Sequence, residues 1–150
     1  MSIVIIRGPE GPHAGGRTHA SSLPGEVLAA LVERAASAGT AIAIRTCASV
    51  EEFASALGIS EREGAELIVA DPGAHAGRSM VAEAMRALRV PYIEVHDDGC
   101  DPLEPQLEGD AGRRIAVVHG YAAQGYMLAM SKALEHLGYA EREFDYHVGI

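Results

Sequence analysis

The feature that most constrains the fold of this chain is a set of five short apolar runs, separated by longer segments with helical periodicity. The runs cover residues 3–7, 41–45, 66–70, 90–96 and 114–120. Most are rich in Ile and Val, and their apolar residues follow one another without the strict alternation of a strand that has one solvated face. Strands of this kind are buried on both faces. The sequence therefore predicts a parallel sheet that is covered by helices on both sides.

The segments between the runs carry the signals of helices. Apolar residues recur at the spacing of one helix face after Pro24, which stands at a helix start, and Gly39 ends this stretch. Ser49 followed by Glu52 is a capping-box pattern and predicts a short helix. After the helix that begins near Pro24, the predicted helices cover residues 49–57, 79–88 and 123–137. The signals predict a single α/β domain over residues 1–150: a flavodoxin-like, doubly wound sheet of five parallel strands in three α/β/α layers.

Composition and charge exclude several classes of function. The chain has 150 residues, of which 48% are apolar, and it is long enough to bury a sizeable core. With 12 basic and 21 acidic residues, its formal net charge of -9 argues against binding to duplex nucleic acid or to an anionic membrane. No apolar stretch is long enough for a signal peptide or a membrane span. The 2 cysteines make no disulfide framework, so we expect a cytoplasmic protein.

Polar side chains gather where the predicted strands end. In an open α/β sheet, ligands bind beyond the carboxyl ends of the strands. Arg7, Asp71 and His119 lie at such ends, and Glu94 precedes His96 by two positions on the same face of one strand. A carboxylate and an imidazole at this spacing form an oriented acid–base or hydrogen-bonding pair. Neither a nucleotide-binding fingerprint nor the spacing of metal ligands is present, so we expect no cofactor and no metal.

Four segments carry a pattern of motifs in a definite order: GPEGPHAGGR (8–17), ADPGAHAGRS (70–79), VPYIEVH (90–96) and GYAAQGYMLAM (120–130). They resemble the motifs of the type II 3-dehydroquinate dehydratases. That family typically shows G-P-N-L-N-x-L-G-x-R, N-P-G-A-x-x-H-x-S, I-P-x-[IV]-E-V-H and G-x-G-x-x-G-Y in the same order. The resemblance extends over nearly the whole chain. It implies a flavodoxin-like fold and trimers that assemble into dodecamers.

The resemblance also implies a lyase that removes water from a cyclic hydroxy-ketone carboxylate through an enolate. In such enzymes a lid Tyr, made basic by a nearby Arg, takes the proton next to the carbonyl, and a His after the N-P-G-A turn protonates the leaving hydroxyl. Arg17 matches the lid Arg, and Glu94 with His96 matches the E-V-H motif. The residues that match the turn, where substrate is bound, are Gly73, Ala74 and Ser79.

Other positions depart from the family pattern. Ser22 stands where the catalytic Tyr is expected, Asp71 replaces the Asn of N-P-G-A, and Gly77 stands in the place of the acid His. A Ser hydroxyl is too weakly acidic to replace a phenolate as base unless another group activates it. We therefore expect little or no activity on 3-dehydroquinate itself. The residues predicted to supply acid and base are His19, Asp71, His75, Glu94 and His96, and those predicted to bind substrate are Arg17, Gly73, Ala74, Arg78 and Ser79.

Two functions of different classes remain open at this point. The first is a divergent lyase that abstracts a proton next to a carbonyl of a small, cyclic, carboxylate-bearing substrate. The second is a non-catalytic relative that binds a ligand or takes part in assembly, having kept the fold and lost the catalytic Tyr and His. The additional histidines near the ligand-binding edge, His13, His19 and His75, favour the enzyme. Homo-oligomers are expected mainly from the resemblance, with a weak hint from the aromatic residues Tyr139, Phe144 and Tyr146.

Overall fold

A computed structural model describes residues 2–9, 23–96, 106–120 and 122–139. These residues form one sheet of five strands, in which every neighbouring pair is parallel. The strands are β1 (Ser2–Arg7), β2 (Ala41–Thr46), β3 (Ala65–Asp71), β4 (Tyr92–His96) and β5 (Arg114–His119). Their order in the sheet is β2-β1-β3-β4-β5, which is the strand order of flavodoxin-like folds. The predicted fold class is confirmed.

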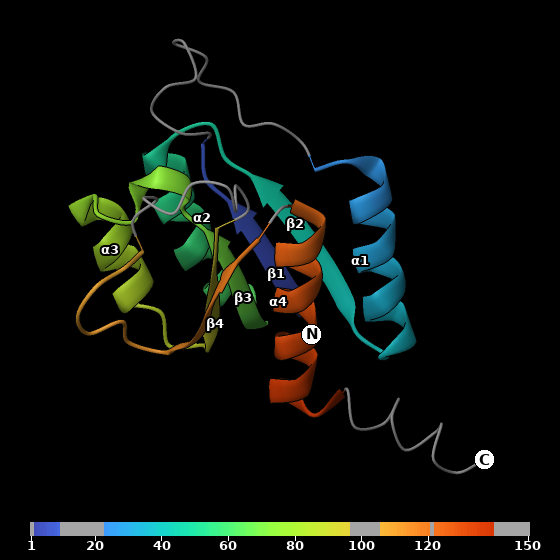
Figure 1. Cartoon of the computed structure of the whole chain (residues 1–150). Coiled ribbons are helices and arrows are strands. Elements are labelled where there is room, and N and C mark those ends of the chain that lie inside the picture. Colours follow the sequence, from blue (N-terminus) through green and yellow to red (C-terminus); the bar gives the residue numbers. More distant parts are fainter. Residues whose placement is uncertain (1, 10–22, 97–105, 121, 140–150) are drawn as a thin grey trace.

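The described residues also form four α-helices, which lie on both faces of the sheet (Figure 1). The helices are α1 (Gly25–Ser37), α2 (Val50–Arg62), α3 (Ser79–Arg86) and α4 (Ala122–Leu137). Helices α1 and α4 pack on one face, and α2 and α3 pack on the other. The three-layer arrangement is therefore as predicted. None of the helices in this part of the chain is long and apolar enough to cross a membrane.

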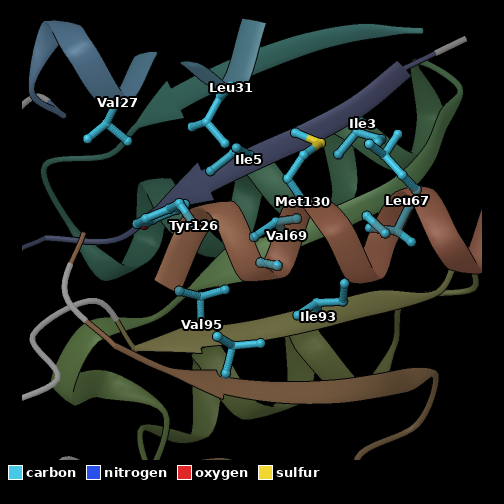
Figure 2. Close-up of a cluster of buried hydrophobic side chains, with 14 of the residues drawn as sticks. Ile3, Ile5, Val27, Leu31, Leu67, Val69, Ile93, Val95, Tyr126 and Met130 are labelled. Carbon is cyan, nitrogen blue, oxygen red and sulfur yellow. The ribbon is translucent and has the colours of Figure 1, made fainter. Parts of the chain in front are cut away.

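The alternation of side chains along each strand divides the core into two halves. Figure 2 shows Ile5, Val69 and Val95 packed in the half of the core that lies between the sheet and helices α1 and α4. Val4 and Ile68, each one position away along the same strands, lie in the other half of the core with α2 and α3. By the same alternation, the polar residues at the carboxyl ends of the strands are divided between the two faces.

Helix α2 is longer than the sequence predicts. The capping box is present, because the backbone N–H of Glu52 donates to the Ser49 hydroxyl at 3.1 Å. The predicted end at Leu57 is wrong, since the helix continues to Arg62. The glycine that follows Leu57 costs a helix interior only about 1 kcal/mol, which is not enough to end it. The chain leaves the helix just before Gly64, whose φ of +93° is incompatible with a right-handed helix.

Two further boundaries differ by two residues from the prediction. Helix α3 ends at Arg86 rather than at residue 88, and strand β4 begins at Tyr92 rather than at residue 90. Pro91 has no amide hydrogen for a sheet ladder, which explains the later start of β4. The predicted loop over residues 10–22 and the predicted C-terminal tail lie outside the described residues.

Candidate active site

A carboxylate–imidazole pair lies at the carboxyl end of β4. Glu94 and His96 are two positions apart on one strand, so both side chains lie on the face that α2 and α3 cover. The Oε2 atom of Glu94 and the Nε2 atom of His96 are 2.6 Å apart, and both residues are fully buried. The two side chains that the sequence pairs by their spacing are therefore in direct contact.

The carboxylate of Glu94 has two further partners. The backbone N–H of Leu107 donates to Oε2 at 3.1 Å, and the guanidinium of Arg114 donates to Oε1 at 3.0 Å. Burial by itself would raise the pKa of Glu94, but the hydrogen bond and charge of His96, with the bonds from Leu107 and Arg114, hold that pKa below its ordinary value. Glu94 is therefore ionised near neutral pH, and the proton in its contact with His96 resides on Nε2.

The ring of His119 stacks on the ring of His96. The two residues are register partners at the ends of β5 and β4, and the backbone N–H of Gly120 donates to the His96 carbonyl at 3.1 Å. Their ring centroids are 5.1 Å apart and their planes differ by 15°. His119 is exposed, and its Nε2 atom lies 3.3 Å from the amide oxygen of Gln106. This edge of the sheet therefore carries two imidazoles that differ in their access to solvent.

A second polar cluster lies on the opposite face of the sheet. Arg7 and Asp71 end β1 and β3 and are partners in the register of the two strands. The hydroxyl of Tyr126, on α4, accepts a hydrogen bond from Arg7 Nε at 3.0 Å and donates one to Asp71 Oδ2 at 2.6 Å. All three residues are buried, and Tyr126 lies in the α1 and α4 half of the core (Figure 2). This cluster joins two strands and a helix at the carboxyl edge.

The turn between β3 and α3 holds most of the residues that are predicted to bind substrate. The backbone N–H of Gly73 donates to Asp71 Oδ1 at 2.9 Å, and Gly73 has a φ of +59°. A Cβ atom at Gly73 would lie 3.1 Å from the carbonyl oxygen of Pro9, so the turn passes close to the segment that follows β1. The other predicted residues of this turn are all at least partly exposed: Ala74, His75, Arg78 and Ser79. They are accessible to a dissolved ligand, and their binding role stays a prediction.

The structure brings some of the predicted acid–base residues together and separates others. Glu94 is in contact with His96, whereas Asp71 lies on the other face of the sheet and bonds to Tyr126. His75 is in the short 3₁₀ helix η1 (Gly73–His75) of the turn. The remaining two predicted site residues, Arg17 and His19, lie outside the described residues.

Four residues of these clusters were not predicted as site residues. Arg7 and His119 end strands, and that position is a signal that the sequence carries. Tyr126 occupies a position of the apolar stripe of the last helix, and periodicity alone does not reveal that its hydroxyl has polar partners. Arg114 begins β5, and it reaches Glu94 only because of the way that β5 lies against β4.

A cavity of about 400 Å³ lies elsewhere, beside the end of β2. It is lined by Arg45, Thr46, Cys47, Glu52, Ser55, Ala56 and Ile59. Burial, with a smaller contribution from the charge of Glu52, raises the pKa of the Cys47 thiol to about 11. A thiol in this state is a poor nucleophile, so this cavity lacks the acid–base chemistry that Glu94 and His96 offer.

Comparisons with known proteins agree with the resemblance found in the motifs. No family model matches the chain. It is 28% identical over 142 residues to a 3-dehydroquinate dehydratase of Pseudomonas aeruginosa, covering 91% of this chain and 97% of that protein. It is 25% identical to a 3-dehydroquinate dehydratase of Ralstonia pickettii, covering 91% of this chain and 92% of the relative. Its fold matches the type II dehydroquinase of Propionibacterium acnes with a TM-score of 0.65 and 22% identity, over 87% of this chain and 95% of that one.

The fold and the polar residues at its carboxyl edge define a flavodoxin-like α/β protein with a buried carboxylate–imidazole pair where such folds bind ligands. The relatives match nearly from end to end, and their names agree with the enzyme and lyase class predicted from the motifs. The chain is therefore similar in sequence to 3-dehydroquinate dehydratases and similar in fold to type II dehydroquinases.

Proposed function

We propose that this protein is a dehydratase-like lyase that takes a proton next to a carbonyl of a small, cyclic, carboxylate-bearing substrate and then expels water. The observation that carries the proposal is the contact of 2.6 Å between Glu94 and His96, buried at the ligand-binding edge of the sheet. The relatives that match 91% of the chain are named as dehydratases, which supports the same reaction type. A dehydration of this type needs a proton acceptor, a proton donor and stabilisation of an enolate.

In this proposal His96 is the proton donor. The C–H bond next to the carbonyl breaks first, its proton goes to a base, and its electron pair forms the enolate. The C–O bond of the β-hydroxyl then breaks, and the oxygen keeps the electron pair, takes a proton from His96 and leaves as water. Glu94 stabilises the imidazolium form of His96 and holds its Nε2 atom, so Nδ1 delivers the proton. Because the ring of His96 is buried, substrate binding must uncover it.

The substrate in this proposal differs from 3-dehydroquinate. Asp71 stands where the family pattern has Asn, and its oxygens accept hydrogen bonds from the Gly73 amide and the Tyr126 hydroxyl. These contacts favour a positioning role for Asp71 over a role as base. The exposed turn residues, together with Arg17, are proposed to bind the substrate carboxylate, and His19 and His75 stay candidates for proton transfer. The residues of the turn in this proposal are Gly73, Ala74, Arg78 and Ser79.

The test separates proton abstraction from the loss of water. The protein is incubated in D₂O with 3-dehydroquinate and with a panel of related cyclic keto-carboxylates. Proton NMR measures the exchange of the hydrogen next to the carbonyl, and ultraviolet absorbance measures the enone product. We expect one or more panel members to exchange, and little turnover of 3-dehydroquinate. His96→Phe is expected to lower the rate of water loss by about 100-fold or more.

Glu66→Gln serves as the matched control for Glu94→Gln, because Glu66 is also a strand carboxylate but lies near the start of β3, at the other end of the sheet. Equal activity of the wild type, Glu94→Gln and His96→Phe would contradict the assignment of the site. If no panel member undergoes exchange or dehydration, the result favours the alternative function, a non-catalytic relative that binds a ligand or takes part in assembly.

The same resemblance leads us to propose a trimer-based homo-oligomer, up to a dodecamer, located in the cytoplasm. Sedimentation equilibrium of the purified protein tests the assembly. A monomeric mass at micromolar concentration would contradict it.

A further inference from the structure

We propose that His119 is a further catalytic residue of this site, namely the base that takes the proton next to the substrate carbonyl. This inference rests on the proposed lyase function and assigns the proton acceptor that the function requires. His119 does not belong to any motif that relates the chain to its family. Its place in the structure, and not the resemblance, is the reason for the assignment.

His119 is the more accessible of the two stacked imidazoles. His96 is fully buried, whereas the ring of His119 is exposed and covers His96 at a centroid distance of 5.1 Å. A dissolved substrate that approaches the carboxyl edge of β4 and β5 therefore meets His119 first. The position of the ring is set by regular structure, because His119 pairs with His96 in the strand register and Gly120 N–H donates to the His96 carbonyl at 3.1 Å.

The ring of His119 is oriented by Gln106. The Nε2 atom of His119 lies 3.3 Å from the side-chain oxygen of Gln106, which can only accept a hydrogen bond. The proton of the neutral ring therefore resides on Nε2, and Nδ1 is the basic nitrogen. Gln106 is thus the residue that orients the base, as an acceptor orients the imidazole in other acid–base sites.

The carboxylate of Glu94 distinguishes the two rings by charge. The ionised carboxylate of Glu94, 2.6 Å from His96, favours a positive charge on that ring. The contact with Glu94 therefore assigns His96 as the proton donor and leaves His119 as the proton acceptor. This is the combination of acid and base that an elimination requires.

The proton balance of the pair closes over one turnover. Nδ1 of His119 takes the proton from carbon, and the electron pair of that C–H bond forms the enolate. His96 then gives its proton to the leaving oxygen, which departs as water with the electron pair of the broken C–O bond. The pair therefore starts with one positive charge on His96 and ends with one on His119. While the enolate exists both rings are protonated, and the negative charges of the enolate and of Glu94 balance them. Release of a proton from His119 to solvent and uptake of one by His96 restore the starting state.

The experiment compares two substitutions that differ in what they preserve. His119→Ala removes the ring, whereas His119→Phe keeps an aromatic ring against His96 but cannot transfer a proton. We measure exchange of the hydrogen next to the carbonyl in D₂O, using the panel member that the wild type exchanges fastest. Both variants are expected to lose about 100-fold or more in kcat, with KM changed much less. Imidazole added to the buffer is expected to restore part of the activity of His119→Ala and none of that of His119→Phe.

His136→Ala is the matched control, because His136 is also exposed but lies in the last turn of α4. Thermal unfolding of each variant identifies any loss of folding. Near-normal exchange by His119→Phe would overturn the assignment, since the ring would then serve packing alone. The assignment would also be overturned if both His119 variants exchanged the hydrogen normally while His96→Phe failed to dehydrate the substrate. If the wild type exchanges no panel member, the proposed function itself fails and the role of His119 fails with it.

Discussion

Tyr126→Phe tests whether the cluster of Arg7, Asp71 and Tyr126 holds the carboxyl edge of the sheet together. The substitution keeps the ring in the core and removes one hydroxyl, which accepts from Arg7 Nε at 3.0 Å and donates to Asp71 Oδ2 at 2.6 Å. Arg7 and Asp71 are 8% and 4% exposed, so water has little access to replace the lost partner. The variant therefore leaves two buried charged groups with one hydrogen bond fewer each.

The magnitude follows from the two bonds. A hydrogen bond to a charged group contributes about 1.5–3 kcal/mol, so the sum for two bonds is an upper bound of about 3–6 kcal/mol. Asp71 keeps the bond from the Gly73 amide, and Arg7 keeps further contacts. We therefore expect the free energy of unfolding to fall by about 2–4 kcal/mol. In a domain of this size, that corresponds to a decrease in Tm of roughly 5–12 °C.

Urea unfolding followed by circular dichroism measures this change, with the slope of the transition checked for each variant. Tyr92→Phe is the control, because Tyr92 is equally buried and its hydroxyl donates to the neutral carbonyl of Ala111 at 2.6 Å. That loss should cost only about 1 kcal/mol. A double-mutant cycle with Asp71→Asn is expected to give a coupling energy of about 1 kcal/mol or more. If Tyr126→Phe is no more destabilising than Tyr92→Phe, the cluster does not hold the carboxyl edge of the sheet together.

Three further predictions concern the carboxylate of Glu94, the backbone conformation of Gly73 and the thiol of Cys47. The pKa of Glu94 is lower in the folded state than its ordinary value of 4.5. The contribution of this carboxylate to stability is therefore complete well above pH 4.5 and is lost as the pH falls through the folded-state pKa. Urea unfolding between about pH 7 and 3 should show a weaker acid dependence for Glu94→Gln than for the wild type. Gly73→Ala should destabilise the folded protein by about 1–2 kcal/mol, because φ is +59° and the new Cβ would lie 3.1 Å from the Pro9 carbonyl oxygen. Gly77→Ala should be nearly neutral in the same assay, because nothing lies within 4 Å of the added Cβ. Cys47 has a pKa of about 11 and is 2% exposed, so it should react with a thiol reagent at pH 8 about 100-fold more slowly in the native than in the urea-unfolded protein. Peptide mass spectrometry measures the two rates, and equal rates would contradict the burial of this thiol.

The fold could be predicted from the sequence because its strands differ clearly from its helices in composition. Strands β1 and β3 are continuous apolar runs, which are typical of parallel strands buried on both faces. The end of α2 was missed because a glycine after Leu57 resembles a stop signal, and a single glycine is a weak one when the next turn still packs on the core. Long-range packing, which decides such cases, is not visible in a local pattern.

The candidate site was predictable only where its parts are close in sequence. Glu94 and His96 are two positions apart on a strand, so period-two alternation is enough to place them together. Arg7 and Tyr126 are separated by 119 positions, and their contact depends on how α4 packs across the end of β1. The stack of His96 and His119 depends in the same way on the register between β4 and β5. No spacing rule within the sequence contains that information.

The division of polar groups between two faces of the sheet limits which residues can act together. Ala70 pairs with Glu94 in the register of β3 and β4, so Asp71 lies level with Val95 and points with it toward α4. His96 points to the other face, where His119 stacks on it. A small substrate whose leaving group contacts His96 therefore has the His119 imidazole beside it, whereas the Asp71 carboxylate lies on the opposite face of the sheet. For this reason the geometry favours His119 as the base and leaves Asp71 to hold the turn that begins at Gly73.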